Sequence, residues 1–540
     1  MTEQRSLPID TQTFEQVRNM GNVYVDKTPY IEKLFRLGRF FFLSRPHRFG
    51  KSLFLSTLQA YFEGRKELFD RLYISDHEEE LACRQRRKPW ESSPVLYFNL
   101  NAEYFASSDV LENCIHRQLS AMEKRYGHDD VAKTIPGRFY NLIERIYEET
   151  EKQVVVLIDE YDKPLLETIN NPELNDANRA LLKAFYEVLK NCDRYIRFAF
   201  LTGITKFSKT NLFSGANNLM DISLLDDYAA ICGFTEQELT DYFMPEIEKL
   251  ALAENTTIEA TRARLKKEYD GYCFSRNGEN VYNPFSLLKV LVTSTYKYYW
   301  FETATPSYLV NYLKRTHVLL PELEEELLLD ESSINDFRYN DDDSIIPLLF
   351  QSGYLTIKRY LREAQLYQLS FPNQEVRFSF LKELLPLYVN VRRDKIFFLA
   401  HKLYKALFSG DLAGAIEQIK SFLAGIIYGN IPNSEEGRPL REQYYQTVLY
   451  AIFRLLGIYT QAEVSCATGR IDMLVTTPQH VYIFEFKVNT QGSAQDAIAQ
   501  IKDKEYFHIV APAGRTLHLV GVSFDEKTRN VGEWKEELCS

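Results

Sequence analysis

The stretch FFFLSRPHRFGKS, residues 40–52, decides how the first half of the chain folds. It opens as an apolar run typical of a buried strand, passes through a turn, and leads into a helical pattern that extends to Phe62. The turn ends in Gly50, Lys51 and Ser52. A phosphate-binding loop needs backbone N–H groups at a helix start, a lysine that reaches the β and γ phosphates, and a hydroxyl for Mg²⁺. These residues supply those parts, so the stretch predicts a site for ATP.

One position in this stretch departs from the usual phosphate-binding loop. Arg45 stands where the common pattern has its first glycine, and a side chain there restricts the backbone. From the loop alone, a coincidental match to the phosphate-binding pattern therefore remains the alternative.

Two further apolar segments favour a nucleotide site. The run VVVLI, residues 154–158, is typical of a parallel strand covered on both faces, and Asp159 and Glu160 follow it. Asp159 would hold the water shell of Mg²⁺, and Glu160 would orient or deprotonate the attacking water. A third strand, residues 196–201, leads to Thr202, which could sense the γ-phosphate. Since open α/β sheets bind ligands at the carboxyl ends of their strands, these strand ends predict one nucleotide site.

A second site is predicted on a hairpin near the other end of the chain, with strands at residues 471–475 and 481–487. A symmetric turn places Asp472 opposite Glu485, with Cβ atoms about 4.5–5.5 Å apart, and Lys487 on the same face. Two like charges destabilise the sheet unless a cation such as Mg²⁺ resolves the repulsion. A neighbouring lysine suits hydrolysis of a phosphodiester. A solvated face carrying ordinary surface charges is the alternative.

The context of the hairpin favours the metal site. Glu442 opens a periodic segment upstream and Glu463 stands just before the hairpin, and either could add a carboxylate. After the hairpin, apolar residues at helical spacing leave Gln500 and Lys504 on an adjoining stripe. The remaining hairpin residues predict one apolar, buried face opposite the charges. That face comprises Ile471, Met473, Val475, Tyr482, Phe484 and Phe486.

Here the chain resembles the PD-(D/E)XK nuclease superfamily, in the form found at the C-terminus of many bacterial ATPases. The resemblance implies that Asp472 and Glu485 bind metal, that Lys487 is catalytic, and that Glu442, rather than Glu463, completes the metal site. It also implies a restriction-endonuclease-like α/β core. The matching residues are Gly469, Arg470, Ile471, Asp472, Glu485, Phe486, Lys487, Gln500, Ile501 and Tyr506.

The first half resembles the AAA-ATPase-like family, whose members carry an RPxRFGKS loop, so the departure at Arg45 is expected there. The resemblance implies that Asp159, Thr202 and the loop bind nucleotide, with Ser52 and Asp159 at the metal. The loop residues are Arg45, Pro46, His47, Arg48, Phe49, Gly50, Lys51 and Ser52. Further matches are residues 25–28, 159–162, 202–208, 217–218, 269–272 and 282–285.

The region between the two sites predicts a mostly helical lid and a winged-helix-like module. Thr235 and Glu238 have the spacing of a helix start, and residues 345–380 predict a helix followed by short strands. Aromatic residues crowd 296–301, where burial between helices is expected and stacking on bases is the alternative.

At 540 residues the chain is too long for one core. We expect an α/β protein with a P-loop NTPase domain over residues 1–225, whose parallel sheet has helices on both faces. We also expect a lid and connector over residues 226–400 and a nuclease-like domain over residues 401–540.

Composition narrows the function classes. The formal net charge of −11 argues against a broad electrostatic coat for nucleic acid, although a local groove with metal ions can still bind phosphates. No run of about 18 apolar residues and no basic leader is present, so the cytoplasm is expected and a membrane is not. The 7 cysteines are scattered without a metal-binding pair.

The leading hypothesis is a cytoplasmic bacterial ATPase coupled to a Mg²⁺-dependent nuclease, with ATP and Mg²⁺ as cofactors and nucleic acid, DNA first, as substrate. The alternative is a nucleotide-switched scaffold or nucleic-acid-binding protein whose nuclease core is weak or depends on a partner. RNA stays open as a substrate. So does a homo-oligomer in which a neighbouring subunit supplies an arginine finger, with Arg45 and Arg48 as candidate fingers within the chain.

Overall fold

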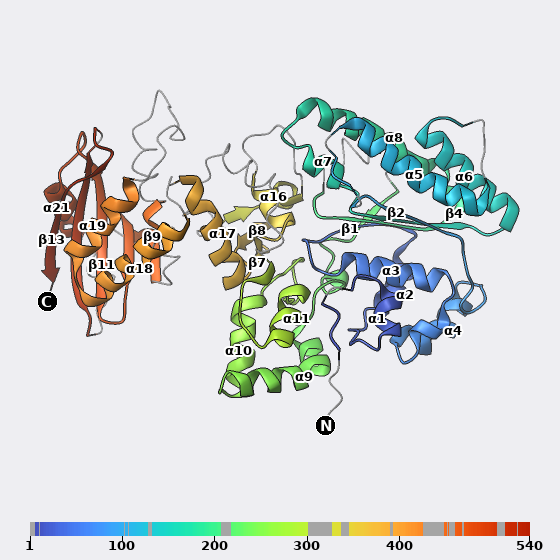
Figure 1. The fold of residues 1–540 in the computed structure, drawn as a ribbon, viewed down its shortest axis with the longest axis horizontal. Coiled ribbons are helices and arrows are strands. Elements are labelled where there is room, and N and C mark those ends of the chain that lie inside the picture. Colours follow the sequence, from blue (N-terminus) through green and yellow to red (C-terminus); the bar gives the residue numbers. More distant parts are fainter. Residues whose placement is uncertain are drawn as a thin grey trace. The chain divides into compact units, whose positions relative to one another are not determined.

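A computed structural model (Figure 1) describes residues 6–9, 11–101, 103–105, 107–127, 132–206, 218–300, 327–335, 345–388, 393–424, 448–450, 452, 459–466, 469–504, 514–525 and 527–539. The chain divides into two compact units, residues 1–312 with 328–376 and residues 313–327 with 377–540. The division into three domains near residues 225 and 400 stays a prediction.

A parallel sheet forms the centre of the first unit. Among the described residues its strands, in spatial order, are β2 (Val95–Asn99), β3 (Val154–Asp159), β4 (Ile196–Gly203), β1 (Phe40–Ser44) and β5 (Met220–Asp221). Every neighbouring pair runs parallel. Since β1 and β3 are buried at every position, their apolar runs require cover on both faces.

Helices supply that cover, as Figure 1 shows. On one face lie α5 (Ser108–Tyr126), α6 (Ile135–Thr150) and α8 (Pro172–Asn191). On the other face lies α3 (Lys51–Phe62), with α1 (Phe14–Asn19), α2 (Pro29–Leu37) and α4 (Tyr73–Arg84) beyond it. The short α7 (Lys163–Glu167) follows β3. The expected parallel sheet with helices on both faces is confirmed.

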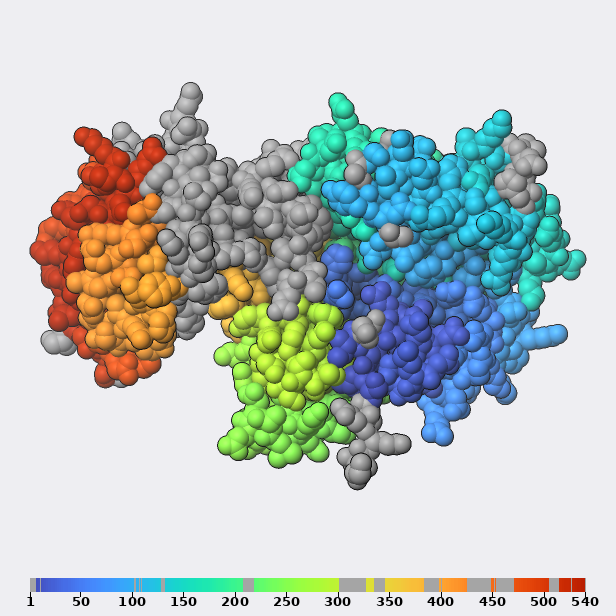
Figure 2. Space-filling view, viewed as in Figure 1, coloured from blue at the N-terminus to red at the C-terminus, as the bar shows by residue number. Residues whose placement is uncertain are grey.

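The predicted helical lid consists of α9 (Glu236–Ala253), α10 (Ile258–Tyr269) and α11 (Pro284–Thr293). The expected helix start is confirmed, because Thr235 and Glu238 cap the first turn of α9 reciprocally. The Glu238 carboxylate also forms an ion pair with Lys27 Nζ at 2.6 Å, and this contact joins the lid to the N-terminal segment. In Figure 2 the surface of these helices, green to yellow-green, abuts the blue surface of the first helices.

A small module completes the first unit. It contains β6 (Leu327–Leu329), α15 (Glu331–Asn335), α16 (Ile345–Gln351), β7 (Thr356–Leu361), β8 (Leu366–Ser370) and the start of α17 (Gln374–Tyr388). A helix is followed by short strands, as expected for residues 345–380. Tyr299 and Trp300 are buried, which agrees with the expected burial of the aromatic cluster.

The second unit contains α18 (Arg393–Ser409), α19 (Leu412–Leu423) and a mixed sheet. Its strands, in spatial order, are β13 (Asn530–Cys539), β12 (Thr516–Asp525), β11 (His480–Val488), β10 (Gly469–Thr476) and β9 (Tyr459–Cys466). β11 and β12 run parallel and are joined through α21 (Ala494–Asp503), while the other neighbours run antiparallel. This strand–helix–strand unit agrees with the expected α/β nuclease-like core.

Helices cover both faces of this hairpin, the apolar face that the alternation predicts to be buried and the face of the charged residues. Leu474 and Ile483, on the face of the charged residues, pack in one cluster with Ile498 of α21. On the opposite face, the Tyr482 hydroxyl donates a hydrogen bond to the carbonyl of Leu407 in α18. The charged residues therefore share their face with a packed helix rather than with open solvent.

Candidate functional site

The turn between β1 and α3 has the backbone of a phosphate-binding loop. Gly50 has a φ of +93°, in the left-handed region where a Cβ would be strained, and α3 begins directly after it. Arg48 also has a positive φ, of +67°. The glycine therefore lets the chain turn sharply into the helix, whose first N–H groups lie at the end of the turn.

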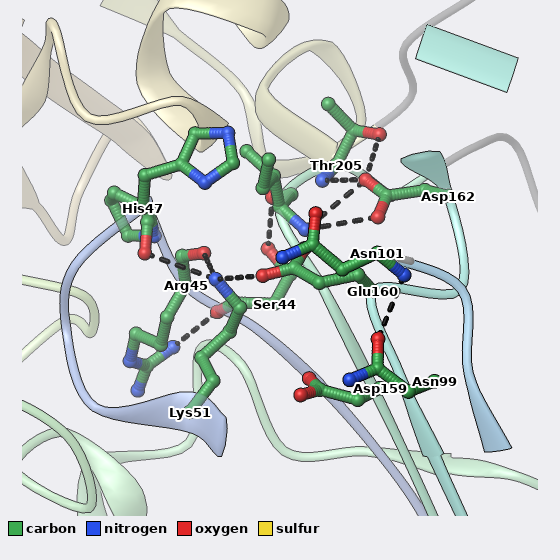
Figure 3. Close-up of polar contacts among 12 residues, drawn as sticks. Ser44, Arg45, His47, Lys51, Asn99, Asn101, Asp159, Glu160, Asp162 and Thr205 are labelled. Atoms are coloured by element: carbon green, nitrogen blue, oxygen red, sulfur yellow. Dashed lines mark hydrogen bonds and ion pairs between the residues drawn. The ribbon is translucent and has the colours of Figure 1, made fainter. Parts of the chain in front are cut away.

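Lys51 is held at the centre of the turn, as Figure 3 shows. Its side chain is buried, and Nζ donates to the carbonyls of Arg45 at 3.1 Å and Pro46 at 3.2 Å. It also forms an ion pair with Glu160 Oε1 at 3.3 Å. The lysine thus joins the loop after β1 to the turn after β3.

Two carboxylates follow one another at the end of β3. Asp159 is buried, and burial together with the charge of Glu160 raises its pKa to about 6. Burial by itself raises the pKa of Glu160, but the charge of Lys51 and its hydrogen bond to the carboxylate outweigh it, so this pKa lies below its usual value. Glu160 therefore carries the negative charge beside the lysine.

Three buried oxygen atoms at this edge of the sheet make no hydrogen bond to any residue that the structure describes. They are Asp159 Oδ1, Glu160 Oε2 and Thr202 Oγ1. Burying a polar atom without a partner costs free energy, so these three oxygen atoms are candidate contacts for a bound ligand. Oxygen ligands beside a lysine and a helix start suit a magnesium–nucleotide complex.

A cavity of about 420 Å³ opens beside Lys51 and Glu160. Its polar wall includes His47, Lys51, Ser52, Asn101 and Glu160. Its apolar wall is built from the N-terminal segment and the lid, with Ile9, Val23, Phe234, Phe285 and Leu288 among its residues. The volume lies within the range of small-molecule sites.

The structure corrects the role expected of Arg45. The guanidinium is 1% exposed and donates to the carbonyls of Ser44, Ser223 and Tyr228, while it stacks 4.3 Å from the ring centre of Phe274. Burial lowers its pKa to about 10, so it stays charged at neutral pH. These carbonyls hold the Arg45 side chain away from the cavity, which it does not line. Its carbonyl, which accepts from Lys51, is what faces the site.

The other loop residues divide between the cavity and the surrounding protein. Arg48 lines the cavity and lies 4.6 Å from the ring centre of Phe285. His47 also lines it, and burial lowers the pKa of its imidazole to about 4, so the ring is neutral at pH 7. The His47 carbonyl accepts from the Trp300 indole at 3.1 Å. Phe49 packs edge-on against Tyr272, with ring centres 4.7 Å apart.

Sequence reasoning missed two residues of this site. Asn101 lines the cavity opposite the loop, and no motif surrounds it; its only signal was a position just after a buried strand. Asp162 was part of a matched motif, but no role followed from its position in the sequence. In the structure it binds the turn after β4.

The second predicted site lies on β10 and β11, and the expected hairpin register is confirmed. Met473 pairs with Phe484, and the pairing continues through Thr476 and Val481. The turn is one residue shorter than expected, since His480 already belongs to β11.

Beyond that ladder, the strands bring the three predicted residues together. The Asp472 carboxylate reaches across to β11 and accepts from the Phe486 N–H at 2.7 Å. Glu485 is 1% exposed, and Lys487 Nζ lies 3.2 Å from its Oε1. Gln500 lies on α21, which packs on β11 and β12. The two carboxylates and the lysine thus belong to one end of the hairpin.

Glu442 and the side chain of Glu463, the other two predicted metal ligands, lie outside the described residues, as does the motif residue Tyr506. Within the described part of the chain, no three His, Cys, Asp or Glu residues form a group that could hold a metal ion. Two carboxylates are nevertheless sufficient for Mg²⁺, which keeps several waters and takes further ligands from phosphate groups.

No helix in the described ranges is both long and apolar enough to cross a bilayer.

Comparison with known proteins matches a family to each of the two motif-bearing regions. A family model described as "Predicted AAA-ATPase" matches residues 8–213, and a model of the PD-(D/E)XK nuclease superfamily matches residues 440–534. A relative from Azotobacter chroococcum mcd 1, "Uncharacterized protein in vnfD 5'region", is 37% identical over 535 residues, which cover 98% of each chain.

A solved structure, that of the Aeropyrum pernix ORC1 protein in complex with DNA, aligns with 65% of this chain and 90% of that chain. Its sequence identity of 11% and TM-score of 0.24 are too low to carry an argument. The assignment rests instead on the two family models and on the relative that matches nearly end to end. The chain belongs to the AAA-ATPase-like family and carries a PD-(D/E)XK nuclease superfamily domain towards its C-terminal end.

Proposed function

We propose that this protein binds and hydrolyses ATP at the loop of residues 45–52 and cleaves nucleic acid, with DNA as the substrate, at the site on β10 and β11. One observation carries the nucleotide half. Lys51 lies between two loop carbonyls and Glu160, beside buried oxygen atoms that lack partners among the described residues. The family assignment supports the nuclease half.

At the nucleotide site, each side chain has a distinct task. Lys51 exchanges its contacts with loop carbonyls and Glu160 for phosphate oxygens, and the N–H groups at the start of α3 bind the same anion. Glu160, which is ionised, accepts a proton from the attacking water or orients that water. Ser52 and Asp159 are the residues that would hold Mg²⁺, and Thr202 lies at the end of the neighbouring strand to contact the γ-phosphate.

The apolar wall of the cavity suits the base of the nucleotide. Phe285 and Leu288 of the lid face the same cavity as Ile9 and Val23 of the N-terminal segment. A planar base is largely apolar on its faces, so it gains from this wall while the phosphates remain at the loop. Nucleotide binding between lid and N-terminal segment would couple the occupancy of the site to the position of the lid.

At the nuclease site, Asp472 and Glu485 would hold Mg²⁺, with Glu442 as a further ligand. Lys487 polarises a water or stabilises the charge that develops on the phosphate. At both sites the cation, when bound, supplies positive charge that neutralises phosphate oxygens. The Phe486 N–H fixes one oxygen of Asp472, so this carboxylate is oriented before a ligand arrives.

One experiment tests both halves of the proposal. The purified chain is incubated with supercoiled plasmid, linear DNA or RNA, with Mg²⁺ or Mn²⁺, and with or without ATP. We expect phosphate release from ATP and metal-dependent cleavage of DNA. ATP hydrolysis without cleavage of any of these nucleic acids would overturn the nuclease half and favour a nucleotide-switched scaffold. Absence of both ATP binding and hydrolysis would overturn the nucleotide half.

A further inference from the structure

Two turns meet at the carboxyl edge of the first sheet, one after β3 and one after β4 (Figure 3). Asp162, in the turn after β3, is completely buried. Its Oδ2 accepts from the N–H of Ile204 at 3.1 Å and from the N–H and hydroxyl of Thr205, both at 2.6 Å. A single carboxylate therefore binds the turn after β4 through three donors.

Tyr161 adds a second set of bonds between the same turns. Its N–H donates to the carbonyl of Thr202 at 3.0 Å, and its hydroxyl donates to the carbonyl of Thr205 at 2.7 Å. Gly203 lies between these bonds. A Cβ at this position would collide with the Asp162 carboxylate and would lie 2.6 Å from the Tyr161 ring. The two turns thus approach too closely for any side chain other than hydrogen at residue 203.

The residues that these bonds hold are those with proposed roles in hydrolysis. Glu160 precedes Tyr161 and has a φ of +51°, a left-handed conformation that is uncommon for a residue with a side chain. Such a conformation persists only where the surroundings enforce it. Thr202 directly precedes Gly203 on the other side. The bonds of Asp162 therefore span from the turn of Glu160 to the strand end of Thr202.

The Asp162 carboxylate is costly to bury, but it binds donors that an apolar side chain would leave unpaired. Burial and the nearby charge of Glu160 raise the pKa of Asp162 to about 7, which shows that its charge is costly there. An apolar residue would avoid that cost, although it would leave three donors unpaired. An asparagine would present its own N–H group to one of these donors. The Ile204 N–H lies 3.2 Å from Oδ1 and 3.1 Å from Oδ2, so the carboxylate presents an acceptor to it on both oxygen atoms.

We propose that Asp162 is a positioning residue for ATP hydrolysis, which holds Glu160 and Thr202 in the one arrangement that activates water against the γ-phosphate. This inference rests on the proposed nucleotide function. It adds that Asp162 acts through Glu160 and Thr202 without touching nucleotide itself. Asp162 therefore affects turnover and not nucleotide affinity.

The test compares Asp162→Asn, Thr205→Val and Thr205→Ser with wild type. We expect Asp162→Asn and Thr205→Val each to lower kcat for ATP hydrolysis by about 10- to 100-fold, the loss typical of a small misplacement of catalytic groups. Their Kd for a non-hydrolysable ATP analogue should stay within about threefold of wild type, since Lys51 and the loop are intact. Thr205→Ser, which keeps the hydroxyl, should restore most of kcat. In the double variant of Asp162→Asn with Thr205→Val the losses in kcat should not multiply, because both changes act on the same bond between residues 162 and 205.

A matched control is Glu78→Gln, which alters another fully buried carboxylate in the same unit, bonded to Tyr61 and Arg87. It should lower thermal stability without lowering kcat.

The inference is overturned if Asp162→Asn and Thr205→Val keep wild-type kcat, if their kcat and nucleotide affinity fall together, or if Glu78→Gln loses kcat equally. Should Asp162→Asn fail to fold, the Thr205 pair decides by the same criteria. A wild-type chain that hydrolyses no nucleotide would overturn the proposed function, whereas an active wild type with active variants would overturn this inference alone.

Discussion

Arg45 shows how one residue can match a motif and still have a different task from the motif's usual residue. Its carbonyl partners Ser223 and Tyr228 lie 178 and 183 positions away in the sequence. A glycine at this position would leave those carbonyls without the guanidinium. The Arg45 side chain thus anchors the strand end to the segment before the lid, while its backbone carbonyl binds Lys51.

At the same scale, substitutions of Lys51 and Glu160 should affect nucleotide binding and nucleotide hydrolysis separately. Lys51→Ala removes the ammonium that faces the phosphates, so ATP binding should weaken by at least 100-fold. Glu160→Gln should keep binding within a fewfold and lose nearly all hydrolysis, because only water activation is affected. Calorimetric titration and phosphate release measure the two properties. Lys190→Ala, at an exposed position on α8, is the control, and wild-type hydrolysis by Lys51→Ala would refute the loop assignment.

Asp159 predicts a pH dependence of stability in the absence of ligands. Its pKa is raised from 3.8 to about 6 by burial and by Glu160, so the folded chain holds this proton more tightly than the unfolded chain. Its contribution to the free energy of unfolding is therefore complete below pH 3.8 and is lost as the pH rises through about 6. Asparagine cannot ionise. Relative to wild type, Asp159→Asn should gain melting temperature between pH 4.5 and 7.5, by roughly 2–4 °C per kcal/mol of lost penalty. A difference that does not change with pH would contradict this account.

At the scale of elements, the hairpin of β10 and β11 was predictable in register but not in surroundings. Alternation and a short turn define which residues pair, and the pairs of Met473 with Phe484 and of Val475 with Tyr482 agree. The alternation in the sequence also predicts one apolar face and one charged face. Only the packing of α21 on the charged face, where Gly521 of β12 lies too close to the Ala494 carbonyl to carry a side chain, shows that both faces are covered.

The same hairpin carries a prediction for cleavage. Asp472→Ala, Glu485→Ala and Lys487→Ala should each lower metal-dependent cleavage of DNA by at least 100-fold and leave ATP hydrolysis within about twofold of wild type. The two sites belong to separate compact units, and distant substitutions usually act independently. Plasmid nicking and phosphate release provide the measurements. Lys420→Ala on α19, which removes a lysine paired with Glu417, should leave both activities intact. Parallel loss of ATP hydrolysis in the three variants would show that the sites are not independent.

At the scale of the whole molecule, the open matter is whether nucleotide controls the nuclease. ATP can shift the arrangement of units only through different affinities for two states. If nucleotide controls the nuclease, Lys51→Ala should change the rate of nucleic-acid cleavage severalfold although the nuclease residues are intact. Added ATP should then no longer alter the cleavage rate of this variant. Cleavage is measured for wild type and Lys51→Ala across a titration of ATP. Cleavage that responds to neither would mean that an ATPase and a nuclease are joined without coupling.

The sequence by itself determined the fold class, the two motif-bearing regions, the end of α3 at Phe62 and the register of the hairpin. These follow from local patterns: apolar runs, alternation, helix starts and a loop whose glycine permits a left-handed turn. Only the tertiary structure decided the task of the Arg45 side chain, the presence of Asn101 in the cavity, the bonds of Asp162 to the turn after β4 and the cover on both faces of the second sheet. The physical reason is that a side chain's partners come from segments far along the chain, so its destination depends on packing that no local pattern contains.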